Sequence, residues 1–334
     1  MKRQSLATLA TCALAGSALF IPAKVGAAAP RITPKKTISI YLVAGITTDA
    51  FYRTMDRGAA TEAAKYGYKF QFVGSPTAFS PNAQLPFLNG AIANKPDFIL
   101  IAPTDHIALI DPLMRAKARG INIITVDTHT DKDAQFAVTN ISSDNVAGGM
   151  TAAKALAGLI GNSGTVAGVS VQPGVSTTDQ RQQGFETGIK SYSKVTYIGT
   201  RFCNDSAPQA SNITKADLAG NKSLKGIFAM NEVSGDGVHT ALQESTQSGQ
   251  IKAGQVKLVE FDAGPEQVTK LRQGAIDALV AQDPYDIGAM AVDMAHRYLT
   301  SGKTGIPKHI GTGEYTITRA NLNSVAAQKY VYKP

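Results

Sequence analysis

The feature that most constrains the fold is a regular alternation of short apolar runs with longer segments of helical periodicity, which continues from Thr37 onward in this 334-residue chain. Short apolar runs without polar alternation are typical of strands buried on both faces. The segments between them are long enough to form the helices that connect parallel strands. The pattern therefore predicts an α/β protein built from parallel sheets with helices on both faces.

The alternation falls into two halves, each of which predicts one doubly wound sheet. The first half is expected to hold strands at 38–43, 68–73, 98–102 and 122–126, with helices at 50–66, 82–94 and 108–119. The second half is expected to hold strands at 165–170, 194–198, 226–229 and 256–261, with helices at 145–160, 179–192, 209–218 and 233–248. The segments after Asp262 have no obvious sheet of their own, and we expect them to return to the first sheet.

Residues 1–28 have the pattern of a secretory signal peptide. Lys2 and Arg3 precede a short apolar run, and small residues near Ala27 suit cleavage. A membrane anchor is the alternative, but the run is rich in Ala and Thr and no second hydrophobic span follows it. A lipoprotein modified at Cys12 would have too short an apolar region before the cysteine. We therefore expect secretion to the periplasm.

Charge and cysteine content narrow the possible partners. Without the signal peptide the formal net charge falls from +8 to +5, and no dense Lys/Arg block follows, so no nucleic-acid partner is expected. Cys203 would then be the sole cysteine, which excludes an intramolecular disulfide. The five histidines show no paired ligand spacing and there is no C-x-x-C, so we expect no metal and no cofactor. A monomer is the default expectation.

Polar residues follow most of the expected strands. In doubly wound sheets, ligands bind beyond the carboxyl ends of the strands. Short polar side chains at these positions either cap helices and brace turns, or bind a ligand together. Carboxylates accept and amides both accept and donate, so the set suits neighbouring hydroxyl groups. The segments concerned are 46–52, 103–106, 127–129, 172–178, 231–232, 262 and 282–283.

Motifs for catalysis are missing from the sequence. The first strand leads into residues 44–48, which do not form a glycine fingerprint for a dinucleotide, and no G-x-S-x-G nucleophile elbow is present. Gly302-Lys303-Thr304 matches only the end of a Walker loop, and a helix precedes it. The chain is therefore not expected to be an enzyme. His106 and His129 lie at strand ends and could still donate to a ligand.

Eight short motifs in order resemble the ribose-binding, type I periplasmic binding-protein family. The resemblance covers essentially the whole chain after the signal peptide, and its motifs are weak singly but specific in combination. They are Asp49-Ala50-Phe51-Tyr52, Ala102-Pro103-Thr104-Asp105, Thr125-Val126-Asp127, Ser143-Asp144-Asn145, Arg181-Gln182-Gln183-Gly184-Phe185, Asn231-Glu232, Glu260-Phe261-Asp262 and Gln282-Asp283-Pro284 with Gly288.

The resemblance implies a sugar or polyol bound between two lobes that are joined by a three-segment hinge. The lobes would be 37–141 plus 283–311, and 142–282 plus 312–334, with crossings near Ile141, Gln282 and Gly311. Phe51 and Tyr52 would contact the sugar ring, and Arg181 would bond a hydroxyl or the ring oxygen through its forked donors. Hydroxyl groups would be bonded by Asp127, Asn231, Asp262 and Gln282.

Departures from the family pattern bear on the ligand. Thr128, which we also assign to the site, replaces a frequent Arg, and Glu232 replaces an Asp. The aromatic residue expected near Phe202 has no clear counterpart, so either Phe202 stacks on the ligand or that wall is thinner. We therefore do not predict ribose itself, and a hexose, deoxy-sugar, polyol or furanosyl compound remains open.

The expected role is the solute-binding component of an ABC importer, which hands its ligand to a membrane permease. Two alternatives stay open: a protein that presents ligand to a chemoreceptor or histidine kinase, and a binder of a non-carbohydrate small polar solute. A transcription regulator can share this fold, but it would need a DNA-binding helix pair where this chain has its signal sequence.

Overall fold

The structure, a computed structural model, describes residues 37–302 and 304–333. These residues contain two six-stranded sheets. The expected signal peptide lies outside these residues. The first sheet has the strand order β11-β5-β4-β3-β1-β2, and all of its neighbouring strands are parallel. Its strands are β1 (Ser39–Val43), β2 (Lys69–Val73), β3 (Phe98–Ile101), β4 (Asn122–Val126), β5 (Ala137–Ser143) and β11 (His309–Thr312).

The second sheet repeats this arrangement. Its order is β12-β10-β9-β8-β6-β7, and only β12 runs antiparallel to its neighbour β10. The first five strands of each half therefore follow the same order, which confirms the predicted doubly wound fold, although the sequence predicted only four of these strands in each half. The strands are β6 (Gly164–Ser170), β7 (Val195–Phe202), β8 (Leu224–Ala229), β9 (Lys257–Phe261), β10 (Ala278–Gln282) and β12 (Glu314–Ile317).

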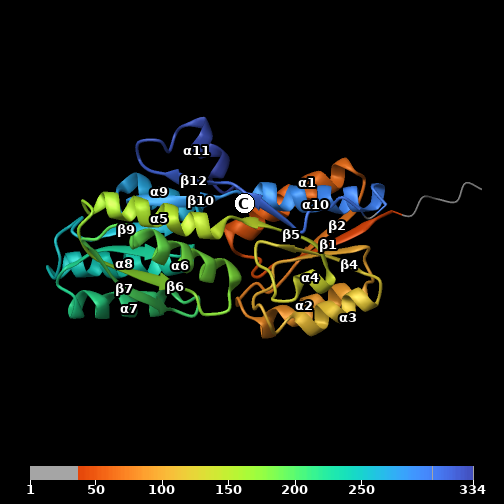
Figure 1. Ribbon diagram of the computed structural model, residues 1–334, viewed down its shortest axis with the longest axis horizontal. Coiled ribbons are helices and arrows are strands. Elements are labelled where there is room, and N and C mark those ends of the chain that lie inside the picture. Colours follow the sequence, from red (N-terminus) through yellow and green to blue (C-terminus); the bar gives the residue numbers. More distant parts are fainter. Residues whose placement is uncertain (1–36, 303, 334) are drawn as a thin grey trace, which may run out of the picture. The chain divides into compact units, whose positions relative to one another are not determined.

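Helices cover both faces of each sheet, and each sheet with its helices is called a lobe below. Figure 1 shows α1 and α10 together on one side of the first sheet, with α2 and α3 on the other. The first lobe contains α1 (Ala50–Lys65), α2 (Pro81–Ala93), α3 (Ile110–Ala118), α4 (Asp133–Phe136) and α10 (Pro284–Thr300). The second lobe contains α5 (Asn145–Leu159), α6 (Ser176–Ile189), α7 (Ala207–Gly220), α8 (Glu232–Gln247), α9 (Pro265–Gln273) and α11 (Val325–Tyr330).

Strand β1 shows why the apolar runs are continuous. Ile40 and Leu42 pack into one core, while Tyr41 and Val43 pack into another on the opposite face of the sheet. Successive side chains of a strand point to opposite faces, so a strand covered on both sides must be apolar at every position.

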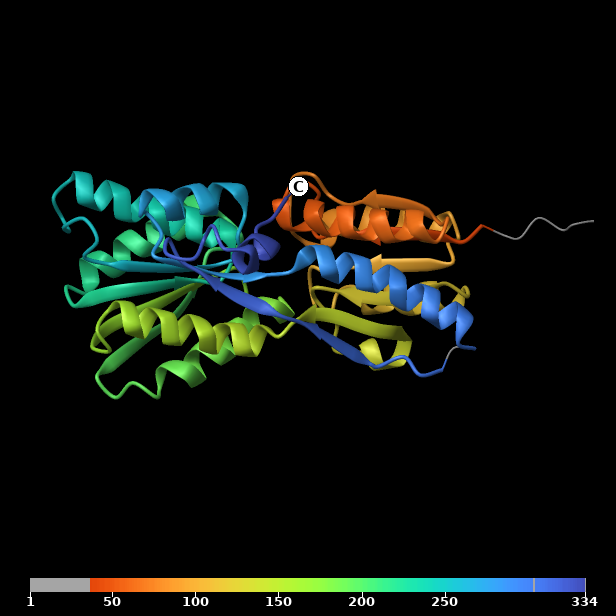
Figure 2. The same cartoon turned by 90° about the horizontal axis from the view of Figure 1, so that it is seen from above.

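The chain passes between the lobes three times. Figure 2 shows these passages, from β5 into α5, from β10 into α10 and from β11 into β12. The expectation that the segments after Asp262 return to the first sheet is wrong for α9 and β10, because β10 pairs with β9 in the second sheet. It is right for α10, which packs on α1. The cause of the error is that a buried parallel strand has the same pattern in either sheet.

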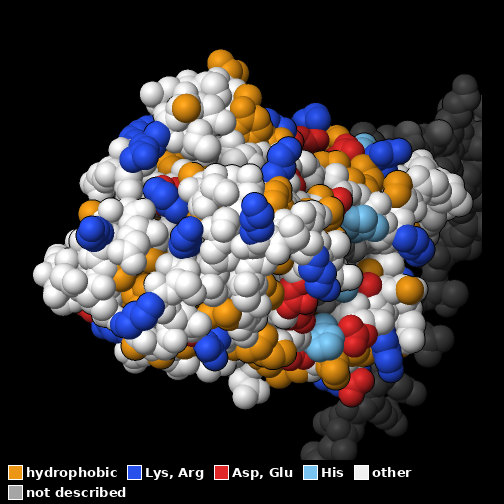
Figure 3. All heavy atoms as spheres, turned by 60° about the vertical axis from the view of Figure 1, so that its left-hand side comes forward, with side chains coloured by type: hydrophobic (Ala, Val, Ile, Leu, Met, Phe, Trp, Pro, Cys, Tyr) orange, Lys and Arg blue, Asp and Glu red, His pale blue; other side chains and the backbone are white. Residues whose placement is uncertain are grey.

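Among the described residues, no helix is both long and apolar enough to cross a membrane. On the face shown in Figure 3, Lys and Arg side chains are spread singly over neutral surface.

Candidate ligand-binding site

A pocket lies between the carboxyl ends of the two sheets and takes its walls from both lobes. The first lobe contributes three aromatic side chains and two carboxylates, and the second lobe contributes most of the polar groups. The lining residues are Ile46, Asp49, Phe51, Tyr52, Phe79, Asp127, Val171, Val175, Thr177, Thr178, Arg181, Asp205, Asn231, Glu232, Asp262 and Gln282. Seven of the eight predicted site residues are in this set.

Thr128 is the predicted site residue that the structure does not bring to the pocket wall. It is 1% exposed and lies behind Asp127, and its Oγ1 has no hydrogen-bond partner among the described residues. Its carbonyl oxygen accepts from Asn140 Nδ2 at 3.4 Å. Thr128 therefore supports the turn after β4.

The aromatic wall is built at the start of α1. Asp49 caps this helix by accepting from the Phe51 N–H at 2.7 Å, which places Phe51 and Tyr52 in the first turn at the pocket. Phe51 contacts Tyr52 edge to face with ring centroids 5.1 Å apart, and the Tyr52 hydroxyl donates to Asp127 Oδ2 at 2.9 Å. Phe79 packs over Gly45, where a Cβ would lie 2.5 Å from its ring. Flat apolar rings beside hydroxyl acceptors suit the C–H face of a sugar.

The second lobe adds no aromatic side chain to the described lining. Its apolar contribution comes from Val171 and Val175. Phe202 and Cys203 do not line the pocket, and Cys203 is fully buried. The sequence leaves open whether Phe202 stacks on the ligand or this wall is thinner, and the structure shows the thinner wall.

Arg181 is held rigidly on the second lobe. Its Nε donates to Asn145 Oδ1 at 2.9 Å, its Nη1 donates to the Met230 carbonyl at 2.8 Å, and its guanidinium lies 3.7 Å from the centre of the Phe261 ring. The close approach of α5 and α6 fixes this position, because a Cβ on Gly149 would lie 2.1 Å from the Arg181 carbonyl oxygen. The remaining guanidinium donors are therefore pre-oriented for a ligand oxygen.

Asn231 has both of the roles that the sequence leaves open for a polar residue at a strand end, which are to cap a helix and to line a ligand pocket. Its Oδ1 caps α8 by accepting from the Ser234 N–H at 3.0 Å, and its Nδ2 donates to Asp205 Oδ1 at 3.0 Å. It is thus a helix cap and a pocket residue together.

Asp262 and Gln282 form a buried pair at the base of the pocket. Gln282 Nε2 donates to Asp262 Oδ1 at 2.6 Å, and the Ser143 hydroxyl donates to Gln282 Oε1 at 2.8 Å. Tyr332 donates to the same Asp262 oxygen at 2.7 Å. Since Ser143 and Gln282 lie at two of the crossings, this network joins the pocket to the hinge.

The lining carries five carboxyl groups and one cation, Arg181. Burial, with nearby Asp262 adding, raises the pKa of Asp49 to about 7. Burial also raises the pKa of Asp127 to about 7, although Arg181 opposes the shift. For Glu232, burial and then Asp49 raise the pKa to about 9. Carboxyls in such surroundings hold protons near neutral pH.

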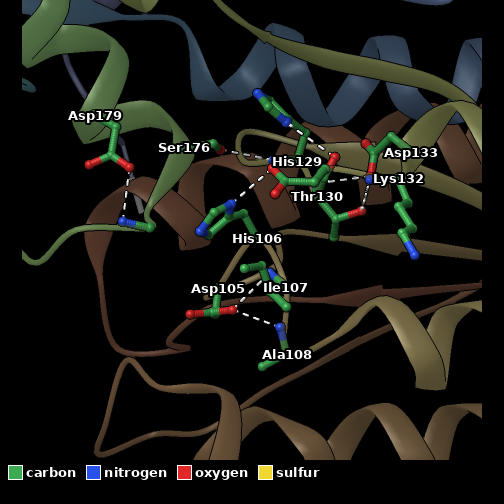
Figure 4. A network of polar contacts seen from close by, with 12 residues as sticks. Asp105, His106, Ile107, Ala108, His129, Thr130, Lys132, Asp133, Ser176 and Asp179 are labelled. Atoms are coloured by element: carbon green, nitrogen blue, oxygen red, sulfur yellow. Dashed lines mark hydrogen bonds and ion pairs between the residues drawn. The ribbon is translucent and has the colours of Figure 1, made fainter.

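Direct hydrogen bonds join the two lobes next to the lining residues Val175 and Thr177, and we call these bonds the latch. The His106 N–H donates to the Gly174 carbonyl at 3.2 Å, and the His129 N–H donates to Ser176 Oγ at 3.0 Å. The His129 ring Nε2 lies 3.2 Å from Gln180 Nε2. Figure 4 shows Ser176 and the two histidine loops in this arrangement.

The two latch histidines do not line the pocket. His106 pairs with Asp131 through Nδ1 at 2.8 Å, and this bond raises the pKa of the imidazole. The suggestion that they donate to a ligand is therefore replaced by a role in holding the lobes together. The structure is that of a closed form.

Two lobes of duplicated doubly wound topology, three crossings and a polar pocket between the strand ends define a two-lobed solute-binding protein. A sequence model of the family described as "Periplasmic binding protein domain" matches residues 40–304, and the chain belongs to this family. The family is one of substrate-binding proteins of transporters and not of enzymes.

Individual relatives agree with this assignment. The chain is 28% identical to the ribose import binding protein RbsB of Escherichia coli K12 over 303 residues, which are 91% of this chain and 95% of that protein. Among solved structures, an ABC transporter solute-binding protein from Agrobacterium vitis, bound with α-D-tagatopyranose, is 41% identical with a TM-score of 0.84 and covers 89% of this chain and 100% of its own. A carbohydrate transporter solute-binding protein from Agrobacterium radiobacter, in complex with D-arabinose, is 28% identical with a TM-score of 0.80 and covers 88% and 99%.

Proposed function

We propose that this protein is the periplasmic solute-binding component of an ABC importer, and that it encloses a sugar or polyol between its lobes for delivery to a membrane permease. The observation that carries the proposal is the pocket itself, in which rings from the first lobe face hydrogen-bonding groups from the second. Ring faces with convergent carboxylates, amides and one guanidinium are the groups that bind a polyhydroxylated ring. The sugars bound by the similar solute-binding proteins support the same class of ligand.

Each predicted site residue on the pocket wall has a role in this proposal. Phe51 and Tyr52 stack on the ring, and Arg181 bonds a hydroxyl or the ring oxygen. The hydroxyl groups are bonded by Asp127, Asn231, Asp262 and Gln282. Thr128 does not line the pocket and supports the turn that carries Asp127.

The lobes in this proposal are 37–141 plus 283–311, and 142–282 plus 312–334, and they move as bodies about the three crossings. Ligand binds the open form, and closure then forms the latch. The permease recognises the outer surface that closure creates. Secretion requires removal of residues 1–28, and the mature chain acts as a monomer without a nucleic-acid partner.

The proposal is tested by the melting temperature of the mature protein against pentoses, hexoses, deoxy-sugars, polyols, nucleosides and amino acids. A ligand that binds only the folded form raises stability by about 2.7 kcal/mol at a hundred times its Kd. A saturable rise with one sugar or polyol supports the proposal. A rise with amino acids or nucleosides alone would keep the family and overturn the ligand class.

A further inference from the structure

The pocket has an excess of negative charge that a neutral sugar does not balance. Among the described residues that line it, the carboxyls are Asp49, Asp127, Asp205, Glu232 and Asp262, and Arg181 is the one cation. Two unit charges 4 Å apart interact by about 4 kcal/mol at the effective dielectric of a protein site. Uncompensated carboxylates in one small pocket therefore repel each other strongly unless they take up protons or bind a cation.

The positive charge of Arg181 compensates mainly Asp127 among these carboxyls. It is a main electrostatic influence on Asp127, whereas the charges acting on Asp49 and Glu232 come from other carboxyl groups. Two of its nitrogens already donate to Asn145 and to the Met230 carbonyl. The region around Asp49 and Glu232 is consequently the part of the pocket with the least compensation.

Asp49 and Glu232 line the pocket from opposite lobes. Asp49 caps α1 in the first lobe, and Glu232 is the first residue of α8 in the second. The helix N-termini favour negative charge, but each by only about 0.3–1 kcal/mol. The two carboxyls lie within electrostatic range of each other, since Asp49 is the charge that most raises the pKa of Glu232. A cation between them would replace this repulsion with attraction.

Glu232 is placed for such a cation and is not used by the protein. Its carboxylate makes no hydrogen bond within the described residues, and it packs against Gly264, where a Cβ would lie 2.5 Å from Oε2. Asp49 Oδ1 accepts from the Phe51 N–H, and its Oδ2 makes no hydrogen bond to any residue that the structure describes. Both side chains thus keep free acceptors toward the cavity.

We propose that the ligand is an aminated sugar or aminated polyol, and that its ammonium group is bound between Asp49 and Glu232. This inference rests on the proposed function and specifies its ligand. An ammonium has three donors and no acceptor, which matches two carboxylates with free oxygens. The hydroxyl groups of the same ligand bond to Arg181 and Asp127 at the other part of the pocket.

A metal ion is a poorer match for these carboxyls. No group of three or more His, Cys, Asp or Glu side chains in the described residues is placed to hold one. Metal ions need several oxygen ligands at short, fixed distances, whereas an ammonium needs only hydrogen-bond distances to two carboxylates.

The high proton affinity of the set supports the same ligand class. Burial raises the pKa of Asp49 to about 7 and that of Glu232 to about 9. With a neutral sugar, Glu232 stays largely protonated and Asp49 partly protonated near neutral pH, whereas an ammonium stabilises both as carboxylates.

The test is a calorimetric titration of the mature protein at pH 7.5 with matched ligands. These are amino derivatives of hexoses, pentoses and polyols, their neutral parents and their N-acetyl forms. The proteins are the wild type, the Asp49→Asn/Glu232→Gln double variant and Glu266→Gln. Glu266 is an exposed carboxylate at the start of α9, so its variant controls for the loss of a charge elsewhere on the second lobe.

We expect at least one amine to bind about tenfold or more tightly than its neutral parent, and N-acetylation to remove the gain. The preference should disappear in the double variant and persist in Glu266→Gln. Neutral sugars that bind more tightly than all of their amines would overturn the inference and leave the proposed function standing. The inference is also wrong if the double variant keeps the amine preference. If none of these sugars and polyols binds, the proposed function itself is wrong.

Discussion

Asp127 and Asp262 occupy equivalent positions in the two lobes. Each directly follows the fourth strand of its half and has a left-handed backbone, with φ of 62° and 82°. The N–H of Asp127 donates to the Ile141 carbonyl at 2.8 Å, and that of Asp262 donates to the Val280 carbonyl at 2.9 Å. This conformation is uncommon for a residue other than glycine. At both positions it directs a carboxylate into the pocket from the end of a strand.

The duplicated position gives a matched pair of variants. Asn tolerates the left-handed conformation and keeps an acceptor, so Asp127→Asn and Asp262→Asn should fold. Each should weaken sugar binding by about tenfold to a hundredfold, because the amide has one acceptor oxygen where the carboxyl group has two oxygens for ligand hydroxyls. Glu266→Gln should bind normally in the same titration. Wild-type affinity in both Asp variants would show that the ligand does not contact these side chains.

Tyr332 ties the end of the chain to the pocket. Its hydroxyl donates to Asp262 and its N–H donates to the Ala263 carbonyl at 3.0 Å, while the Lys333 N–H bonds Thr54 Oγ1 in the first lobe at 3.1 Å. Tyr332→Phe should lower the free energy of unfolding by about 1 kcal/mol, since a buried hydrogen bond is lost. Urea unfolding checks this value. An unchanged midpoint would mean that Asp262 is satisfied without Tyr332.

The latch should control dissociation more than association. Ser176→Ala removes the hydroxyl that accepts from the His129 N–H between the lobes, and so destabilises the closed form by about 1 kcal/mol. Ligand dissociation, followed by stopped flow, should become about fivefold faster with little change in the association rate. Thr187→Ala, which removes only a bond within α6, is the control. Equal dissociation rates in the two variants would contradict the role of the latch.

The raised pKa of Asp49 makes the stability of the closed form depend on pH. Because the folded pKa is about 7 and the ordinary value is 3.8, the folded form binds more protons between these values. Stability therefore falls as pH rises through this window, and the loss is complete above it. Asp49→Asn should be more stable than the wild type by about 1–3 kcal/mol at pH 8, and this difference should vanish near pH 4. Thermal melts across this range provide the measurement. A constant difference at all pH values would contradict the assignment.

Much of the fold could be predicted because buried parallel strands are apolar at every position. Strand β3 shows this, with all four residues of Phe98–Ile101 buried. The apolar pattern alone could not allocate β10 to a sheet, since its sequence fits either one and only its pairing with β9 decides.

The site residues that sequence reasoning missed follow edge strands. Asp205 lies beyond β7, a strand with partly exposed residues that was predicted to end at Ile198 but continues to Phe202. Phe79 lies beyond β2, the edge strand of the first sheet. Edge strands lack the continuous apolar run, so their ends are hard to locate. Asp49 stood within a recognised motif, but its position on the pocket wall depends on the helix cap that it forms.

The central claim is that a sugar or polyol binds between the lobes against Arg181. The most direct test is a calorimetric titration of the mature wild type and of Arg181→Met with the sugar or polyol that gives the largest rise in melting temperature. We predict one site per chain in the wild type and a loss of affinity of about a hundredfold or more in Arg181→Met, because the guanidinium donors and the countercharge to Asp127 are removed together. Binding of wild-type strength by a folded Arg181→Met protein would contradict the account.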